Sequence, residues 1–191
     1  SSAGIFGQCL LKCGKNATMS KYDLVAAYKQ VPCKVSDIRL QGFAWLGKYF
    51  AETRQVFGAK TSVSNYDTVG ETIKLISMLE NPAPGAHVLR QVDDVPIVAV
   101  QNSGLCESFS ETYKKVCGEL NVELAPPCPL FDKAFENEKR GKVLGVLFDA
   151  TDLTWCLGEK KTQKVMNSII QILLQESCTL KQWQKLLGRL N

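Results

Sequence analysis

The sequence has a single histidine, His87, among its 191 residues. Catalysis that depends on a histidine base is therefore disfavoured. No apolar run approaches the ~18 residues of a membrane span, and the N-terminus lacks the apolar segment of a signal peptide. We expect an intracellular protein, nuclear or cytoplasmic, with no membrane partner.

The eight cysteines do not have the regular spacing of a disulfide scaffold. Several of them, including Cys33 and Cys117, lie within apolar segments, which favours reduced thiols. Cys9 and Cys13 form a pair, but no second Cys or His pair follows at zinc-site spacing, so we expect no structural zinc.

Internal repeats and low-complexity tracts are also absent, and 45% hydrophobic residues are enough to fill the core of one domain, or of one domain and part of a second. Pro/Gly-rich joints at 82–85 and 126–129 divide the chain into thirds. The net charge of +4 is compatible with a phosphate-rich partner but is weak evidence for one.

The hydrophobic periodicity predicts a mixed α+β fold. Helices are expected at 61–79, 107–120, 159–176 and 179–190, with helix-compatible residues at 25–30. Strands are expected at 18–24, within a hairpin at 43–59, at 87–91 and 95–100, and at 142–150 paired with 153–157.

The most informative stretch is Val92-Asp93-Asp94, which lies between two β-prone runs and predicts a tight hairpin with the acidic pair at its tip. Asp is a common turn residue, so the pair taken alone is best explained as a solvated turn. A third carboxylate, Asp23, lies where the predicted strand 18–24 ends.

Phosphoryl transfer by two metal ions needs hard oxygen ligands from separate chain segments. Asp23 at a strand end and Asp93 and Asp94 at a hairpin tip can supply them. No histidine is required for this chemistry, which suits the composition.

Four segments together resemble the palm motifs of reverse transcriptases, in the same order and spacing. They are 22-YDLVAAYKQVP-32, 57-FGAKTSVSNYDTV-69, 91-QVDDVPIV-98 and 133-KAFENEKRGKVLGVLFD-149. The resemblance implies an α+β polymerase palm, in which a small antiparallel sheet is backed by helices, followed by the start of a helical thumb or connection.

The same resemblance implies a division of the chain. Residues 1–20 would end the fingers region, 21–157 would form the palm with a fingers-side hairpin insertion at about 37–57, and 158–191 would begin the thumb or connection. The stretch 143-VLGVLFDATDLTW-155 is most similar to DIRS-type retroelements, which pair a reverse transcriptase with a tyrosine recombinase.

By this resemblance Asp23, Asp93 and Asp94 are the catalytic residues and hold two Mg²⁺ ions, or Mn²⁺. The backbone carbonyl of Leu24 would complete the shell of one metal.

The resemblance also implies a nucleotide site at Leu24, Ala27, Tyr28, Phe57 and Gly58. A ring at Tyr28 would leave no room for a 2′-hydroxyl and so favour deoxynucleotides, although a core aromatic is the alternative. Gly58 would permit close approach of the backbone to the nucleotide.

Lys133 matches a lysine near the triphosphate, with a solvated lysine as the alternative. The primer contacts would be Gln91, Val92, Leu144 and Gly145. Gln91 departs from the aromatic residue that is most common at its position, and Leu144 and Gly145 could equally serve plain sheet packing.

The implied function is RNA-directed DNA polymerisation, a nucleotidyltransferase reaction on an RNA template with a DNA primer and deoxynucleoside triphosphates. We expect a fragment of a larger polyprotein that also contains fingers, ribonuclease H, and a recombinase or integrase, and we expect the isolated chain to be inactive. Alternatives are a non-catalytic palm that acts as an interaction module, and an RNA-dependent RNA polymerase, which Tyr28 disfavours.

Overall fold

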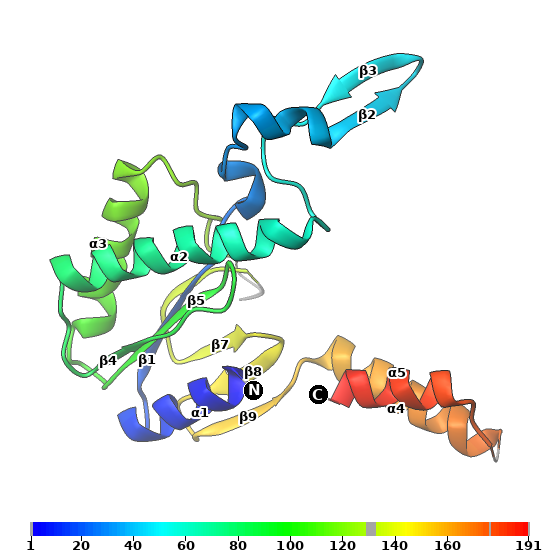
Figure 1. The fold of residues 1–191 in the computed structure, drawn as a ribbon. Helices are drawn as coiled ribbons and strands as arrows, with labels where there is room; N and C mark the ends of the chain where they lie inside the picture. The colour runs from blue at the N-terminus through cyan, green and yellow to red at the C-terminus, as the bar shows by residue number, and fades with distance from the viewer. Residues whose placement is uncertain (1, 129–132, 176, 191) are drawn as a thin grey trace.

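The computed structural model describes residues 2–128, 133–175 and 177–190. At its centre is a four-stranded antiparallel sheet in the order β4-β5-β1-β6 (Figure 1). These strands are β1 (Thr18–Tyr22), β4 (Ala86–Val88), β5 (Val95–Ala99) and β6 (Phe135–Glu138). All of β5 and most of β1 are buried, because both faces of these two inner strands are covered.

Helices α2 (Lys60–Glu80) and α3 (Leu105–Glu119) cover one face of this sheet (Figure 1). Alternate residues of β5 point toward them, since side chains on a strand change face at every step. Val95, Ile97 and Ala99 thus pack with Ile73 of α2 and Phe109 of α3 in one buried cluster.

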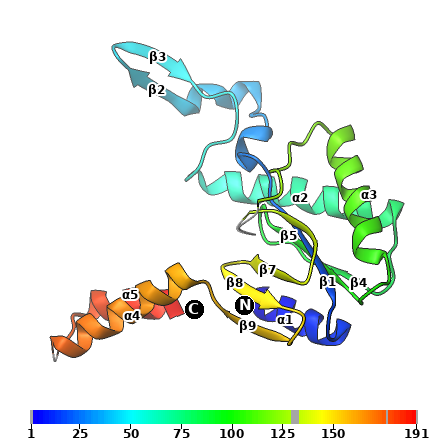
Figure 2. The ribbon, with the colours of Figure 1, turned by 180° about the vertical axis from the view of Figure 1, so that it is seen from behind.

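Helix α1 (Ser2–Cys13) covers the opposite face, with Phe6 and Leu10 packed against Met19 of β1 and Val98 of β5 (Figure 2). This helix was not predicted. Its buried residues Phe6, Cys9, Leu10 and Cys13 have helical spacing, but two glycines and two cysteines give the segment little helix propensity. Burial on the sheet stabilises it instead.

A second, three-stranded antiparallel sheet has the order β7-β8-β9 and joins the α1 cluster through Val143 and Phe148. Its strands are β7 (Arg140–Val143), β8 (Val146–Asp149) and β9 (Thr154–Leu157). The prediction of a single strand over 142–150 was wrong, because Leu144 and Gly145 both have positive φ (52° and 81°) and form a two-residue hairpin turn.

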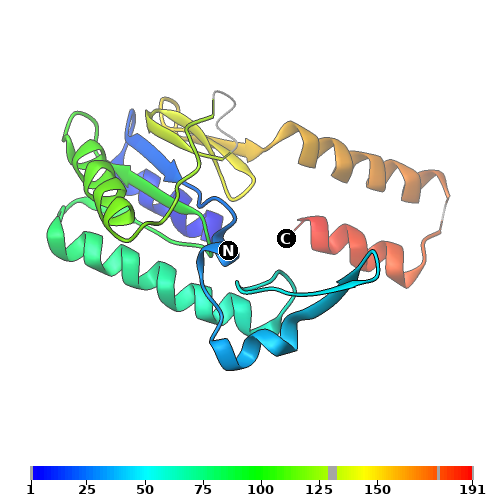
Figure 3. The same ribbon diagram turned by 90° about the horizontal axis from the view of Figure 1, so that it is seen from above.

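Two arms project from the same side of this body (Figures 1 and 3). One contains the 3₁₀ segments η1 (Ala27–Gln30) and η2 (Val35–Gln41) and the hairpin of β2 (Gly42–Trp45) and β3 (Lys48–Ala51). The other is the helix pair α4 (Glu159–Leu174) and α5 (Leu180–Leu190).

The mixed α+β prediction is confirmed, as are the β2–β3 hairpin, the acidic hairpin and the predicted helices at α2, α3, α4 and α5. Residues 27–30 form a 3₁₀ segment rather than an α-helix. The predicted helix end at Glu176 lies outside the described residues. No helix among the residues described is long and apolar enough to span a membrane.

Candidate active site

The β4–β5 hairpin carries the acidic pair on a tight turn. The Gln91 amide donates to the Asp94 carbonyl at 2.9 Å, and the Asp94 amide donates to the Gln91 carbonyl at 3.1 Å. Val92 begins the turn with φ 56°, a left-handed conformation that β-branched residues avoid. The turn that presents the two carboxylates is therefore strained, as functional turns often are.

The sheet register brings Asp23 to the same place. Strands β1 and β5 are antiparallel with Tyr22 opposite Val95. One step further along each strand places Asp23 across from Asp94. The Asp23 carbonyl then accepts the Ala125 amide at 2.8 Å, which ties the end of β1 to the segment after α3.

The three carboxylates influence one another electrostatically. Burial, and then the charge of Asp93, raise the pKa of Asp23 above its ordinary value, while Lys21 and Lys133 oppose the shift. Burial likewise raises the pKa of Asp94, with Lys21 lowering it and Asp23 and Asp93 raising it. Concentrated negative charge of this kind favours a bound cation.

Lys21 supplies part of the compensating charge. It lies on β1 with only 3% of its side chain exposed, and its Nζ is 3.5 Å from Oδ1 of Asp94. The alternation of β1 places Lys21 on the same face as Met19, toward α1. Sequence reasoning missed this lysine, although a charged residue inside an otherwise buried strand is a usable signal.

The candidate ligands are carboxylate oxygens, which divalent cations such as Mg²⁺ prefer, and they come from two separate segments of the chain. Within the described ranges, however, no three His, Cys, Asp or Glu side chains already form a ligand group. Two features agree with this separation of the carboxylates: Asp94 is in contact with Lys21, and the carboxylates repel one another.

The Leu24 carbonyl, expected to join a metal shell, lies directly beyond Asp23. Leu24 forms an isolated antiparallel β-bridge with Leu124. The hydrogen bonds of this bridge are made by its neighbours: the Asp23 carbonyl accepts from Ala125, and the Val25 amide donates to the Glu123 carbonyl at 3.0 Å. The bridge therefore does not use the Leu24 carbonyl.

The predicted nucleotide residues Ala27 and Tyr28 lie on η1 and are 3% and 7% exposed. The Tyr28 ring packs edge-on against Phe57, with centroids 4.7 Å apart, and against Tyr66 of α2 at 5.5 Å. Phe57 is 74% exposed. The structure thus brings Tyr28 and Phe57 together, and Tyr28 also belongs to a buried cluster with Tyr66.

Gly58 precedes α2 with φ 88°, in the left-handed region that favours glycine. A Cβ at this position would meet no heavy atom within 4 Å. The conformation, rather than crowding within the chain, is thus the reason for glycine here.

Tyr66 is a further residue that sequence reasoning missed. It is 1% exposed, and burial followed by the charge of Asp93 raises its pKa. Among the described residues its hydroxyl has no hydrogen-bond partner. In the sequence, Tyr66 is one residue within the predicted helix 61–79, and no local pattern distinguishes it.

The predicted primer contacts fall on two hairpin turns. Gln91 and Val92 belong to the acidic turn, where Ser2 Oγ donates a hydrogen bond to Gln91 Oε1. Leu144 and Gly145 form the β7–β8 turn, and Leu144 packs against the α1 cluster together with Leu89. Both hairpins therefore rest on the same core.

Lys133 is exposed, and its charge lowers the pKa of Asp23. The ammonium group of Lys133 is thus close enough to act on the charge of Asp23. The residues just before it, 129–132, lie outside the described residues.

No family model matches the chain, and no curated protein matches it. Solved structures of the foamy viral protease-reverse transcriptase do match. The complex with an RNA/DNA hybrid has TM-score 0.65 and 18% identity, covering 90% of this chain and 20% of that one. A complex of the dRH protein with double-stranded DNA has TM-score 0.64 and 21% identity, covering 90% of this chain and 26% of that one.

A further complex with double-stranded DNA has TM-score 0.63 and 20% identity, covering 91% of this chain and 32% of that one. This chain thus spans between 20% and 32% of those proteins. At such identities the likeness concerns the fold alone. The chain has a mixed α+β fold that resembles part of a reverse transcriptase.

Proposed function

We propose that this chain is the catalytic palm of an RNA-directed DNA polymerase. The observation that carries the proposal is that β1 and the β4–β5 turn deliver Asp23, Asp93 and Asp94 to one end of the central sheet. The reverse-transcriptase-like fold, whose solved relatives hold an RNA/DNA hybrid or double-stranded DNA, supports it.

In this proposal Asp23, Asp93 and Asp94 hold divalent ions, Mg²⁺ or Mn²⁺, with the Leu24 carbonyl beside them. Such ions, when bound, lower the pKa of a primer 3′-hydroxyl and neutralise charge on the triphosphate. The chain's own contribution is to hold carboxylates from two segments in one place.

The other residues bind and orient the substrates. Tyr28 limits the space beside the sugar, so deoxynucleotides are accepted in preference to ribonucleotides. Lys133, whose charge acts on Asp23, approaches the triphosphate. The turns at Gln91-Val92 and Leu144-Gly145 contact the primer end.

The substrates would be an RNA template, a DNA primer and deoxynucleoside triphosphates. We also propose that the chain belongs to a larger retroelement polyprotein, since it spans at most 32% of the matched structures. The DIRS type is proposed only on the resemblance of residues 143–155. The rest of the polyprotein would supply the fingers residues that orient the triphosphate.

A second candidate is a palm without catalysis that binds nucleic acid or protein. It is favoured by one observation, namely that the described side chains form no ready-made acidic ligand group. The two candidates differ in whether the aspartates are needed for nucleotide addition.

The test is extension of a primed RNA template by the complete polypeptide that contains this chain. We expect extension with deoxynucleotides and magnesium, little with ribonucleotides, and a loss of at least about 10³-fold in Asp93→Ala. Asp152→Ala is the matched control, because Asp152 is an exposed aspartate on another turn.

Extension by Asp93→Ala at the wild-type rate would contradict the metal assignment. Nucleic-acid binding without extension by the wild type would favour the non-catalytic candidate.

A further inference from the structure

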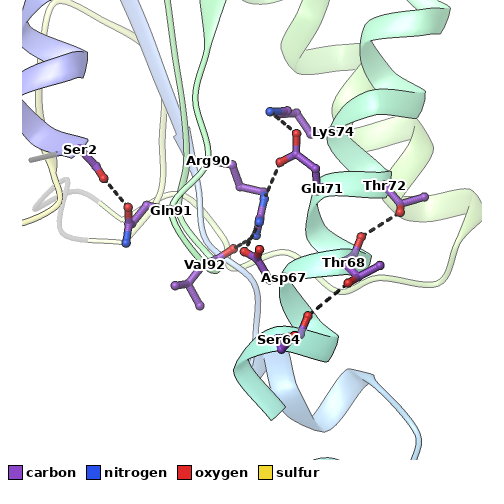
Figure 4. Close-up of polar contacts among 10 residues, drawn as sticks. All are labelled: Ser2, Ser64, Asp67, Thr68, Glu71, Thr72, Lys74, Arg90, Gln91 and Val92. Carbon is purple, nitrogen blue, oxygen red and sulfur yellow. Dashed lines mark hydrogen bonds and ion pairs between the residues drawn. The ribbon is translucent and has the colours of Figure 1, made fainter. Parts of the chain in front are cut away.

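Arg90 lies between β4 and the acidic turn and reaches across to α2 (Figure 4). Only 6% of its side chain is exposed. Its Nε donates to Glu71 Oε2 at 3.1 Å, and its Nη2 pairs with Asp67. Its Nη1 donates to the Val92 carbonyl at 2.7 Å. One guanidinium therefore bonds both the helix and the turn.

One face of α2 accommodates the Arg90 guanidinium. Asp67, Gly70 and Glu71 lie at i, i+3 and i+4, so they share one face of the helix. A Cβ at Gly70 would lie 2.8 Å from Arg90 Nη1 and 3.4 Å from Cδ. A larger residue at this position would therefore force the guanidinium to move from the place where it bonds its two carboxylate partners.

The bond to the Val92 carbonyl is the important one. The partners Asp67 and Glu71 are 59% and 42% exposed, so their ion pairs with Arg90 contribute little net stability. They do, however, fix the direction of a planar donor group. That group bonds the residue at which the turn is strained, with φ 56°.

The helix reached by Arg90 also carries Tyr66, which packs on Tyr28 of the nucleotide site. Arg90 therefore joins the turn with Asp93 and Asp94 to the helix beneath that site. We infer that Arg90 is a positioning residue that clamps the acidic turn to α2, so that the carboxylates and the nucleotide site keep a fixed relative position. Only the effect of Arg90 on catalysis rests on the proposed function; the clamp itself does not.

Two readouts test the clamp. The first is amide hydrogen exchange at Gln91 and Asp94 in the 191-residue chain, because these amides make the turn's own hydrogen bonds. The second is the split between kcat and KM for deoxynucleotide in the complete polypeptide. A lost clamp opens the turn and misplaces the carboxylates, so we expect exchange to rise about tenfold and kcat to fall about tenfold, with KM changed less.

The variants are Arg90→Met, Arg90→Lys and Gly70→Ala. Arg90→Met keeps the length of the side chain without the donors, and Arg90→Lys keeps the charge without the planar fork. Gly70→Ala leaves Arg90 in the chain but displaces its guanidinium, so it separates geometry from loss of charge. All three are expected to act alike. Arg140→Met is the matched control, because Arg140 is 64% exposed and its Nε is 3.9 Å from Asp149.

Exchange at Gln91 and Asp94 that is unchanged in all three variants overturns the clamp, whatever the activity. Faster exchange with unchanged kcat overturns the positioning role. If the wild type shows no polymerase activity, the proposed function fails, and the exchange measurement still decides whether Arg90 holds the turn.

Discussion

At the scale of single residues, the carboxylate site combines burial with neighbouring like charges. Lys21 pairs with Asp94, yet the pKa of Asp94 and of Asp23 still lies above the ordinary value. Without a cation, the folded state must hold like charges close together in a partly buried place. Sites arranged for function often carry such a cost in stability.

Replacing Asp93 by Asn should therefore stabilise the metal-free chain while it removes metal binding. Burial is the main cause of the raised pKa of Asp23 and Asp94, and the charge of Asp93 adds to it; removing that charge should raise the free energy of unfolding at neutral pH by roughly 0.5–1 kcal/mol. Urea unfolding followed by circular dichroism measures this. Asp152→Asn should leave the stability unchanged, and a destabilised Asp93→Asn would contradict the crowding of charge.

The same residues predict a pH dependence. Because the folded pKa of Asp23 and Asp94 is raised, the folded state binds protons more readily than the unfolded state. Their contribution to the free energy of unfolding thus grows as the pH falls through the raised pKa toward the ordinary value of 3.8. The advantage of Asp93→Asn over the wild type should accordingly shrink in acid, which a pH series of unfolding curves checks. An advantage that is constant with pH would contradict it.

At the scale of elements, helix α2 packs on β5 and is bonded to Arg90, and the register of its packing can be tested. Ile73 is 2% exposed in the cluster with β5, whereas Leu79 is 80% exposed. Ile73→Ala should cost about 2–4 kcal/mol of unfolding free energy, because it leaves a cavity against the sheet.

Leu79→Ala should change the stability by less than about 0.5 kcal/mol, since exposed positions contribute little. Chemical denaturation measures both variants. Equal effects of the two substitutions would mean that α2 lies on the sheet in another register.

The elements that could be predicted from the sequence are those with a local signal. The periodicity of α2 and α3 marked them as helices, and the β-prone runs around Asp93 marked the acidic hairpin.

The features that escaped prediction depend on distant parts of the chain. Helix α1 forms because the sheet buries its apolar face. The roles of Lys21 and Arg90 appear only when β1, the acidic turn and α2 come together. Lys21 pairs with Asp94, 73 residues away, and Arg90 joins the nearby Val92 to Glu71 and Asp67, which lie 19 and 23 residues away. Pairing of that kind follows from tertiary structure and leaves no local pattern.

At the scale of the whole molecule, the acidic turn lies at the end of the sheet from which both arms project (Figures 1 and 3). The β2–β3 arm is exposed at every strand residue, including Phe43, Trp45 and Tyr49. The α4–α5 arm also exposes apolar side chains. If the proposed function holds, this shape places the carboxylates between two exposed surfaces.

The proposed metal site of Asp23, Asp93 and Asp94 is tested most directly by manganese titration followed by NMR. Paramagnetic Mn²⁺ broadens the amide signals near its binding site even when affinity is weak, and excess Mg²⁺ should displace it. We predict selective broadening at residues 23–25 and 91–95 in the 191-residue chain, lost in Asp93→Asn and retained in Asp152→Asn. Broadening elsewhere, or broadening at these residues that persists in Asp93→Asn, would contradict the account.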